Sequence, residues 1–203
     1  LRSRGLGDVY KRQTQGKAVI ENTDAIIDVN SISVDESKFK LESGTSIKDI
    51  FIDNEKSVSL GKNDGQAPSE ESPLVLGIDL SKSMRGSKEG IALASENSIE
   101  MEQIVIKAPK TSSNSDASMP EKGSITYVDE NGVTKTVEFN ENSNEARSKG
   151  SNGDIVIDLG TQVAVKQISI NVTANRGNKN ISEIAKIESV SYTHLTLPTK
   201  LEV

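Results

Sequence analysis

The sequence contains no cysteine and no tryptophan, and it has one histidine in 203 residues. Without cysteine the chain cannot form disulfide bonds, thiolate zinc sites or cysteine nucleophiles. The histidine, His194, lies near the C-terminal end, so a Ser-His-Asp triad or a histidine-bound metal cannot form in the preceding sequence. Paired carboxylates can hydrolyse glycosides, but aromatic residues, which commonly grip sugars, make up 3% of the chain. We therefore expect a protein that is not an enzyme.

Both ends of the sequence resemble translated sequencing-library adapters. Residues 3–13 read SRGLGDVYKRQ and residues 190–200 read VSYTHLTLPTK. Back-translated, the two segments contain the same DNA word, AGATGTGTATAAGAGACAG, read from opposite strands. We therefore assign residues 1–13 and 189–203 to adapter DNA and set them aside before reasoning about the fold. A chain cut in this way gives no information on signal peptides, anchors or flanking domains.

Removing these ends changes the charge balance of the protein. They hold five basic residues and two acidic residues, so the remainder carries a net charge of −9, whereas the whole chain carries −6. Nucleic acids and anionic membranes bind proteins that carry clustered Lys and Arg. Because this protein is acidic, we expect neither as a partner. No apolar run approaches the length of a transmembrane helix, so we expect no membrane insertion within the fragment.

The apolar pattern favours strands over helices. Short runs that alternate or are continuously apolar are typical of strands, and they occur at residues 25–34, 47–52, 73–80, 101–108, 125–130, 133–139, 154–159, 165–174 and 184–187. Asn131-Gly132 separates two of these runs and predicts a hairpin with a type I′ turn. Polar connectors at residues 61–72, 111–122 and 140–152 predict loops, and a short helix is expected around residues 91–94. The pattern predicts an all-β protein, an antiparallel β-sandwich of the jelly-roll type.

One phrase resembles the core of the galactose-binding, discoidin-like (coagulation factor type C) superfamily. Residues 153–174 read GDIVIDLGTQVAVKQISINVTA, an apolar strand ending in Asp-Leu-Gly, followed by an alternating strand. Residues 47–103 are similar to the opening of such modules in surface proteins of gut Firmicutes. The resemblance implies a sandwich that binds glycans or proteins through loops at one end, often with a structural calcium ion. The expected loops contain no aromatic residue, so the ligand-binding residues stay unknown.

Acidic loop residues suggest a site for the calcium ion that the resemblance implies. Asp49, Asp53 and Asn54 lie close together in the sequence, and their side chains offer the oxygen ligands that Ca²⁺ takes. Glu55 and Asp64 could add to them. The spacing does not match an EF-hand loop, and a charged loop can equally be a solvated surface. We expect Ca²⁺ as the one candidate cofactor.

A second motif points to a different class of protein. Asp79, Ser81 and Ser83 form a DxSxS pattern after an apolar strand, which resembles the metal-ion adhesion motif of von Willebrand factor A domains. One carboxylate and two hydroxyls could hold Mg²⁺ there. Such a domain requires a parallel, doubly wound sheet, whereas the downstream sequence predicts hairpins.

The sequence thus predicts a non-catalytic attachment module, with a glycan or a surface protein as its partner. Residues 44–188 are assigned to the discoidin-like sandwich, and residues 14–43 either close a preceding module or belong to this one. We expect the parent to be a larger bacterial protein, secreted or at the cell surface, whose other domains flank the module. A metal-dependent adhesion domain and a structural spacer without a ligand are the alternatives.

Overall fold

A computed structural model describes nine segments of the chain. They are residues 17–19, 25–42, 46–52, 57–82, 85–87, 98–109, 118–140, 147–149 and 154–190. Within these segments the secondary structure consists of β-strands and short 3-10 helices, with no α-helix. Both adapter-like ends up to residue 13 and from residue 191, and the helix expected around residues 91–94, lie outside the described residues. No helix in the described part is long and apolar enough to cross a membrane.

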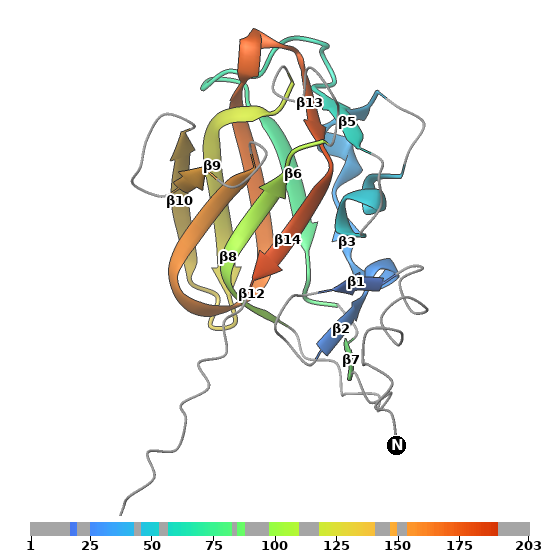
Figure 1. The fold of residues 1–203 in the computed structure, drawn as a ribbon, viewed down its shortest axis with the longest axis vertical. Coiled ribbons are helices and arrows are strands. Elements are labelled where there is room, and N and C mark those ends of the chain that lie inside the picture. Colours follow the sequence, from blue (N-terminus) through green and yellow to red (C-terminus); the bar gives the residue numbers. More distant parts are fainter. Residues whose placement is uncertain are drawn as a thin grey trace, which may run out of the picture.

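The strands form an antiparallel β-sandwich, which confirms the predicted fold class (Figure 1). One layer has the strand order β10-β9-β12-β6-β3. The opposite layer contains β14, β8 and β11 together with the first part of β12. The bounds of these strands are β3 (Ser33–Val34), β6 (Leu74–Asp79), β8 (Ile99–Lys107), β9 (Pro120–Asp129), β10 (Thr134–Asn140), β11 (Arg147–Lys149), β12 (Ile155–Asn175) and β14 (Lys186–Val190).

Two small three-stranded sheets complete the structure. One has the order β1-β2-β7 and the other has the order β13-β5-β4. Their strands are β1 (Lys17–Val19), β2 (Ala25–Asp28), β7 (Arg85–Ser87), β4 (Lys40–Leu41), β5 (Val58–Gly61) and β13 (Ile181–Ile184). Among the described residues, 3-10 helices connect the strands at η3 (Val29–Ser31), η4 (Glu36–Lys38), η5 (Ile47–Phe51) and η7 (Arg176–Asn178). The short strands β4, β5 and β13 were not predicted from the sequence.

The long strand β12 joins the two layers. Its first part pairs with β8 and its second part with β6 and β9, and the register shifts between Asp158 and Val163. Gly160 lies at this shift with φ +82°, a left-handed conformation that glycine adopts without a steric penalty. The prediction of two separate strands at residues 154–159 and 165–174 is therefore wrong, because one bulged strand bends from layer to layer.

Local hydrogen bonds overrule two other predictions. The predicted strand at residues 47–52 is instead η5 with Ile52 as its C-cap, because Ser46 caps the helix by accepting from the backbone N–H of Lys48, and Asp49 accepts from the N–H of Ser46. Residues 25–34 form β2, η3 and β3 instead of one continuous strand.

The β9–β10 hairpin is confirmed, but its turn is not type I′. Gly132 has φ +79°, whereas Asn131 does not have positive φ. The backbone N–H of Gly132 donates to the carbonyl of Asp129 (3.0 Å), and the N–H of Asp129 donates to the carbonyl of Val133 (3.0 Å). This is the three-residue connection in which a type I turn is followed by a left-handed glycine. The Asp129 carboxylate stabilises it by accepting from the N–H groups of Asn131 and Val133.

A single hydrophobic core fills the space between the layers. It includes residues of the segment before residue 44, among them Val29, Ile32 and Phe39, so this segment packs on the sandwich. Phe39, Phe51, Tyr127 and Phe139, all the aromatic residues between the two adapter-like ends, are buried in the same core. Packing is therefore their role, and none of them offers a surface on which a sugar could stack.

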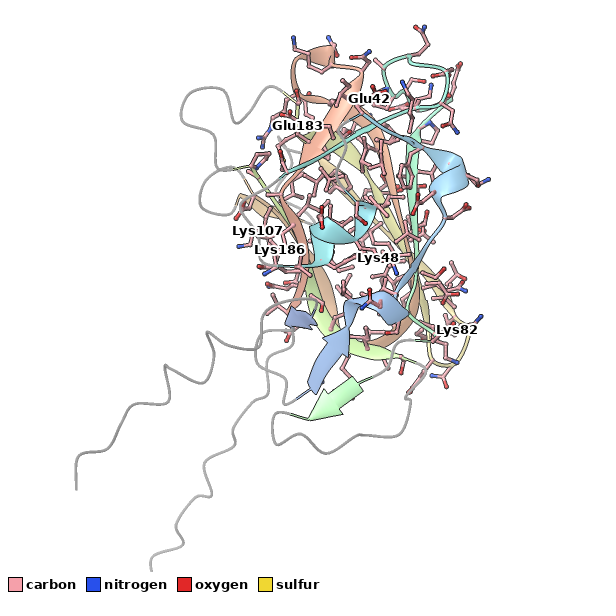
Figure 2. All side chains as sticks on the ribbon, turned by 90° about the vertical axis from the view of Figure 1, so that its right-hand side faces the viewer. Glu42, Lys48, Lys82, Lys107, Glu183 and Lys186 are labelled. Carbon is pink, nitrogen blue, oxygen red and sulfur yellow. The ribbon has the colours of Figure 1, made fainter. Side chains whose placement is uncertain are left out.

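A network of ion pairs lies near the edge of the opposite layer. The Lys107 ammonium lies 3.3 Å from Asp154 and 3.5 Å from Glu188, and Lys186 lies 2.8 Å from Glu188. Figure 2 shows Lys107 and Lys186 next to one another on this side of the molecule. Burial alone would lower the pKa of Lys107, but the two carboxylates raise it. The network ties the start of β12 to the ends of β8 and β14. Ser189 and Val190, which the sequence assigns to the adapter-like end, complete β14.

Candidate functional site

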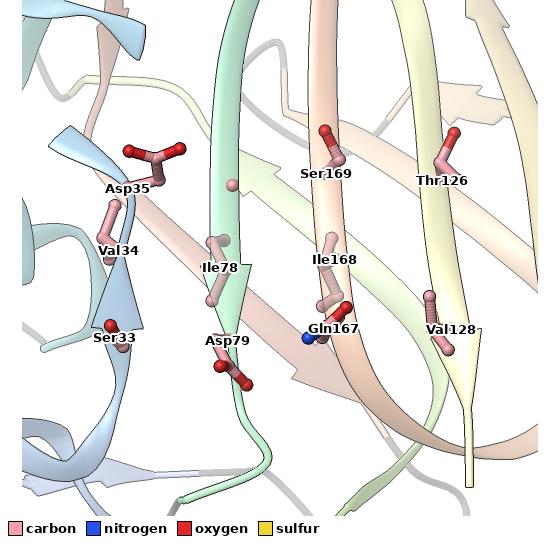
Figure 3. A pocket seen from close by; sticks show the side chains of 11 residues that line it. Ser33, Val34, Asp35, Ile78, Asp79, Thr126, Val128, Gln167, Ile168 and Ser169 are labelled. Atoms are coloured by element: carbon pink, nitrogen blue, oxygen red, sulfur yellow. The ribbon is translucent and has the colours of Figure 1, made fainter. Parts of the chain in front are cut away.

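A groove crosses the outer surface of the five-stranded layer. Its volume is about 620 Å³, and it spans β3, β6, β12 and β9, about 14 Å at ordinary strand spacing. Its lining residues, shown in Figure 3, are Ser33, Val34, Asp35, Gly77, Ile78, Asp79, Thr126, Val128, Gln167, Ile168 and Ser169. This groove is the candidate functional site.

The alternation of side chains along each strand explains which groups line the groove. In β6 the side chains of Leu74, Leu76 and Ile78 are buried in the core, so the residues between them face outward. In β12 the same alternation buries Ile168 and Ile170 and turns Gln167 and Ser169 outward. The core-facing residues contribute backbone to the groove floor, while the outward residues supply the groups that a ligand would meet.

Gly77 lies in the floor of the groove. It pairs with Ser169 of β12, and the Asp35 backbone N–H donates to its carbonyl oxygen at 3.0 Å. A Cβ atom at Gly77 would have as its nearest neighbour the Cβ of Asp35, at 3.7 Å. This is ordinary van der Waals contact, so the fold does not require glycine here. The missing side chain instead leaves open space between Asp35 and Ser169.

Asp35 forms one wall of the groove at the edge of the layer. Its Oδ1 accepts from the Ser37 hydroxyl at 2.5 Å and from the Ser37 backbone N–H at 3.2 Å. The hydroxyl hydrogen bond, and then the backbone one, lowers the pKa of Asp35 from its ordinary value of 3.8. Asp35 is therefore held as a carboxylate, and its Oδ2 is not used by these two hydrogen bonds. The groove thus has a fixed hydrogen-bond acceptor on this wall.

Asp79 and Gln167 lie side by side at the other end of the groove. They are register partners on β6 and β12, and Figure 3 shows their side chains next to one another. The Asp79 Oδ1 accepts from the Ser81 backbone N–H at 2.9 Å, while Gln167 is exposed. A carboxylate and an amide here offer acceptors and donors within reach of one small polar ligand.

Hydroxyl groups and the Val128 side chain line the remaining floor of the groove. The Ser169 hydroxyl donates to Asn171 Oδ1 at 3.2 Å, and the Thr126 hydroxyl lies 3.0 Å from that of Thr136. These side chains are oriented by bonds along and between strands, so they need little reordering to meet a ligand. Together with Ser33 they give the groove small hydroxyl groups beside the two carboxylates, and Ser169 and Thr126 lie on the strands beyond β6 from Asp35.

No aromatic, lysine or arginine side chain belongs to the lining of the groove within the described part of the chain. Its two ionisable side chains are both acidic, Asp35 and Asp79. The arrangement can accept hydrogen bonds from hydroxyl and amino groups. It has no surface suited to stacking and no cation to bind an anion.

Two of the acidic residues suggested for calcium make local hydrogen bonds in the structure. The Asp49 carboxylate accepts from the backbone N–H of Ser46 and so belongs to the cap of η5. Asp64 accepts from the N–H of Gln66 and pairs with Lys62 at 3.0 Å. Asp53 and Asn54 lie outside the described residues, as does Glu55. Among the described residues no group of three or more acidic, histidine or cysteine side chains could hold a metal ion. Calcium binding stays a prediction.

The adhesion-domain alternative is wrong. β6, which carries Asp79, pairs antiparallel with both β12 and β3, so the described strands do not form the parallel, doubly wound sheet that this alternative requires. Ser81 lies in a turn after Asp79, and its backbone N–H donates to the Asp79 carboxylate. Ser83 lies outside the described residues. Asp79 is nevertheless in the candidate site, as part of the groove.

Most of the residues that line the groove were not predicted from the sequence. Gln167 and Ser169 stand within a predicted strand, and their alternation with buried isoleucines could have identified them as one polar face. Asp35 and Gly77 could not be found this way, because their proximity depends on β3 pairing with β6 across more than forty residues of sequence.

Comparison with known proteins supports the fold and gives no close relative. No protein-family model matches the sequence, and no curated protein matches it significantly. Among solved structures, the family 32 carbohydrate-binding module of C. perfringens NanJ, in complex with galactose, is 15% identical with a TM-score of 0.50. The match covers 78% of this chain and 93% of that one.

Two further structures have the same architecture. The first such module of a family 31 glycoside hydrolase from Clostridium perfringens is 12% identical, with a TM-score of 0.50 and coverage of 79% and 94%. A structure of two such modules with the M60 catalytic domain of Clostridium perfringens ZmpB is 10% identical, with a TM-score of 0.51. That match covers 90% of this chain and 15% of the other. The chain therefore has the galactose-binding-like, discoidin-like β-sandwich fold of the family 32 carbohydrate-binding modules.

Proposed function

We propose that this protein is a non-catalytic glycan-binding module that holds its ligand in the groove of the five-stranded layer. The observation that carries the proposal is the lining of the groove, in which hydroxyls, one amide and two carboxylates face outward together. Sugar hydroxyls donate and accept hydrogen bonds, and such side chains match them. The protein shares its fold with the family 32 carbohydrate-binding modules, and one of these has been solved in complex with galactose.

The chemistry of the groove suits binding better than catalysis. A glycosidase acting through two carboxyls needs one of them to be a proton donor with a raised pKa. The pKa of Asp35 is lowered instead, because Ser37 donates to its carboxylate. Asp35 is thus suited to accept hydrogen bonds from a ligand. The comparison with modules that accompany catalytic domains supports a role as one part of a larger secreted or surface protein.

The lining also indicates the strength of binding. Each hydrogen bond contributes about 1 kcal/mol net, and the groove offers no aromatic ring to add stacking energy. We expect a dissociation constant of about 1 mM for a single site, equivalent to ~4 kcal/mol. Useful attachment at this affinity would require several modules on one chain or a repetitive glycan.

Gly77→Val tests the proposal, since it fills the groove without disturbing the strand. The nearest atom to a Cβ at this position lies at 3.7 Å, and a β-branched residue favours strand conformation. The whole chain should be titrated with galactose, N-acetylglucosamine oligomers and other host-type glycans by calorimetry. We expect Gly77→Val to weaken the binding of every glycan that binds by at least about tenfold.

Thr134→Val is the matched control. Thr134 is an exposed residue of β10 in the same layer, and it is not among the residues that line the groove. This variant should bind as the unchanged protein does. If no glycan in the panel binds, or if Gly77→Val binds normally while folded, the proposal is wrong. If no glycan binds, the alternative of a structural spacer without a ligand is favoured.

A further inference from the structure

The charges of the groove are of one sign. Asp35 stands on one wall and Asp79 at the end of the floor, on neighbouring strands of the layer. Neither carboxylate forms a salt bridge with a described lysine or arginine. Lys38, close to Asp35 in sequence, has the weakest influence among the groups that act on that carboxyl. The negative potential of the groove is therefore not neutralised from within its lining.

Both carboxylates are held in place by their own backbone turns. One oxygen of Asp35 accepts from Ser37, and one oxygen of Asp79 accepts from the N–H of Ser81. These bonds use Oδ1 of each residue and fix the orientation of the other oxygen. Such fixed acceptors would meet a ligand cation with little loss of side-chain entropy. A charge-assisted hydrogen bond between an ammonium group and a carboxylate is roughly twice as strong as a neutral one.

The polar groups beside the two carboxylates indicate which cation fits. The floor offers the Ser169 and Thr126 hydroxyls and the Gln167 amide, and Gly77 leaves room above the floor. Several linked sugar rings that carry hydroxyls and amino groups could together use these contacts. The groove crosses four strands, which suits an extended chain of such rings.

We propose that the groove selects glycans that carry free amino groups, of the glucosamine type, over neutral and acidic glycans. This inference rests on the proposed glycan-binding function and adds the chemical class of the ligand. Asp35 and Asp79 would each accept a hydrogen bond from an ammonium group, while the hydroxyls and Gln167 bind the ring hydroxyls. A sialylated or sulfated glycan would be repelled by the same carboxylates.

The test compares two ligands that differ in their amino groups. The whole chain is titrated with a β-1,4-linked glucosamine hexamer and with its fully N-acetylated form, at slightly acidic pH and low salt. We expect the free-amine hexamer to bind about tenfold tighter or better. This preference should shrink as salt is raised, because ions screen exposed charges over about 10 Å at 0.1 M.

The variant Asp35→Asn/Asp79→Asn keeps the size of both side chains and removes their charge. We expect it to bind the two hexamers within about twofold of one another, with the N-acetylated form little affected. Glu130→Gln/Glu138→Gln makes the same change in net charge at exposed residues outside the groove, and it should keep the preference of the unchanged protein.

The outcomes separate this inference from the function on which it rests. Equal binding of both hexamers, abolished by Gly77→Val, would overturn the amine preference and keep the glycan-binding groove. If the Glu130→Gln/Glu138→Gln control also loses the preference, the preference comes from the overall charge of the protein, and the inference is overturned too. Binding of neither hexamer nor any other glycan would overturn both. An oligolysine peptide is titrated in the same way. If it binds more tightly than the amine hexamer and its binding requires Asp35 and Asp79, the groove is a site for basic peptides and the inference is overturned.

Discussion

Gly77 and Gly123 lie on β6 and β9, the strands that flank β12, yet they have opposite tolerance for a side chain. A Cβ at Gly123 would lie 2.1 Å from the carbonyl oxygen of Asn171 and 2.9 Å from Cζ of Phe139. The backbone of β12 and a buried aromatic ring therefore occupy the space that a methyl group would need. At Gly77 the nearest atom is at 3.7 Å, so the same methyl group fits.

Gly123→Ala should therefore destabilise the protein strongly, because β9 and β12 would have to separate or the Phe139 ring would have to move. We expect a loss of about 3 kcal/mol or more in the free energy of unfolding. Gly77→Ala, the matched control in the same layer, should change it by less than about 0.5 kcal/mol. Urea denaturation of both variants measures the difference. Similar stability of the two variants would contradict the close approach described at Gly123.

At the scale of elements, the junction between β8 and the start of β12 depends on one buried carboxylate. Asp154 accepts from the Ala108 backbone N–H at 2.8 Å and pairs with Lys107 at 3.3 Å. Asp154→Ala would leave a buried N–H without its acceptor. We expect a cost of about 1–3 kcal/mol in the free energy of unfolding.

Asp158→Ala is the control for this prediction. Asp158 also lies near the start of β12 and also accepts a backbone N–H, from Gly160 at 2.7 Å, but it is exposed to water. Water can replace an exposed acceptor, so this change should cost less than about 1 kcal/mol. Thermal or urea unfolding would show the contrast. Equal losses in the two variants would mean that burial does not set the importance of Asp154.

The elements also show which parts of the structure the sequence could predict. The apolar pattern identified β6, β8, β9, β10 and both parts of β12, although residues 73–80 predicted a strand covered on both faces and β6 buries only one. It failed at residues 47–52, where apolar residues are buried on a 3-10 helix and the Ser46 cap decides the conformation. The turn at Asn131-Gly132 was assigned the wrong type, because Asp129 stabilises a longer connection.

At the scale of the whole molecule, the fold class could be predicted and the site could not. Many short strands with turn-rich connections suffice to indicate an antiparallel sandwich. The groove instead brings together Asp35, Asp79, Ser169 and Thr126, residues from four strands that are distant in the sequence. Their proximity depends on the strand order of the layer, which local patterns do not specify. The resemblance implied binding through loops at one end, whereas the groove lies on the surface of a sheet.

The most direct test of the central claim is a map of ligand contact by heteronuclear NMR. Amide resonances of the isotopically labelled whole chain should be followed during titration with the glycan that binds best. We predict that the largest shifts cluster on Asp35, Gly77, Asp79, Gln167 and Ser169 and are not seen in Gly77→Val. Shifts confined to the loops, such as residues 62–66 and 176–180, with the groove residues unchanged, would contradict the claim that the groove is the binding site.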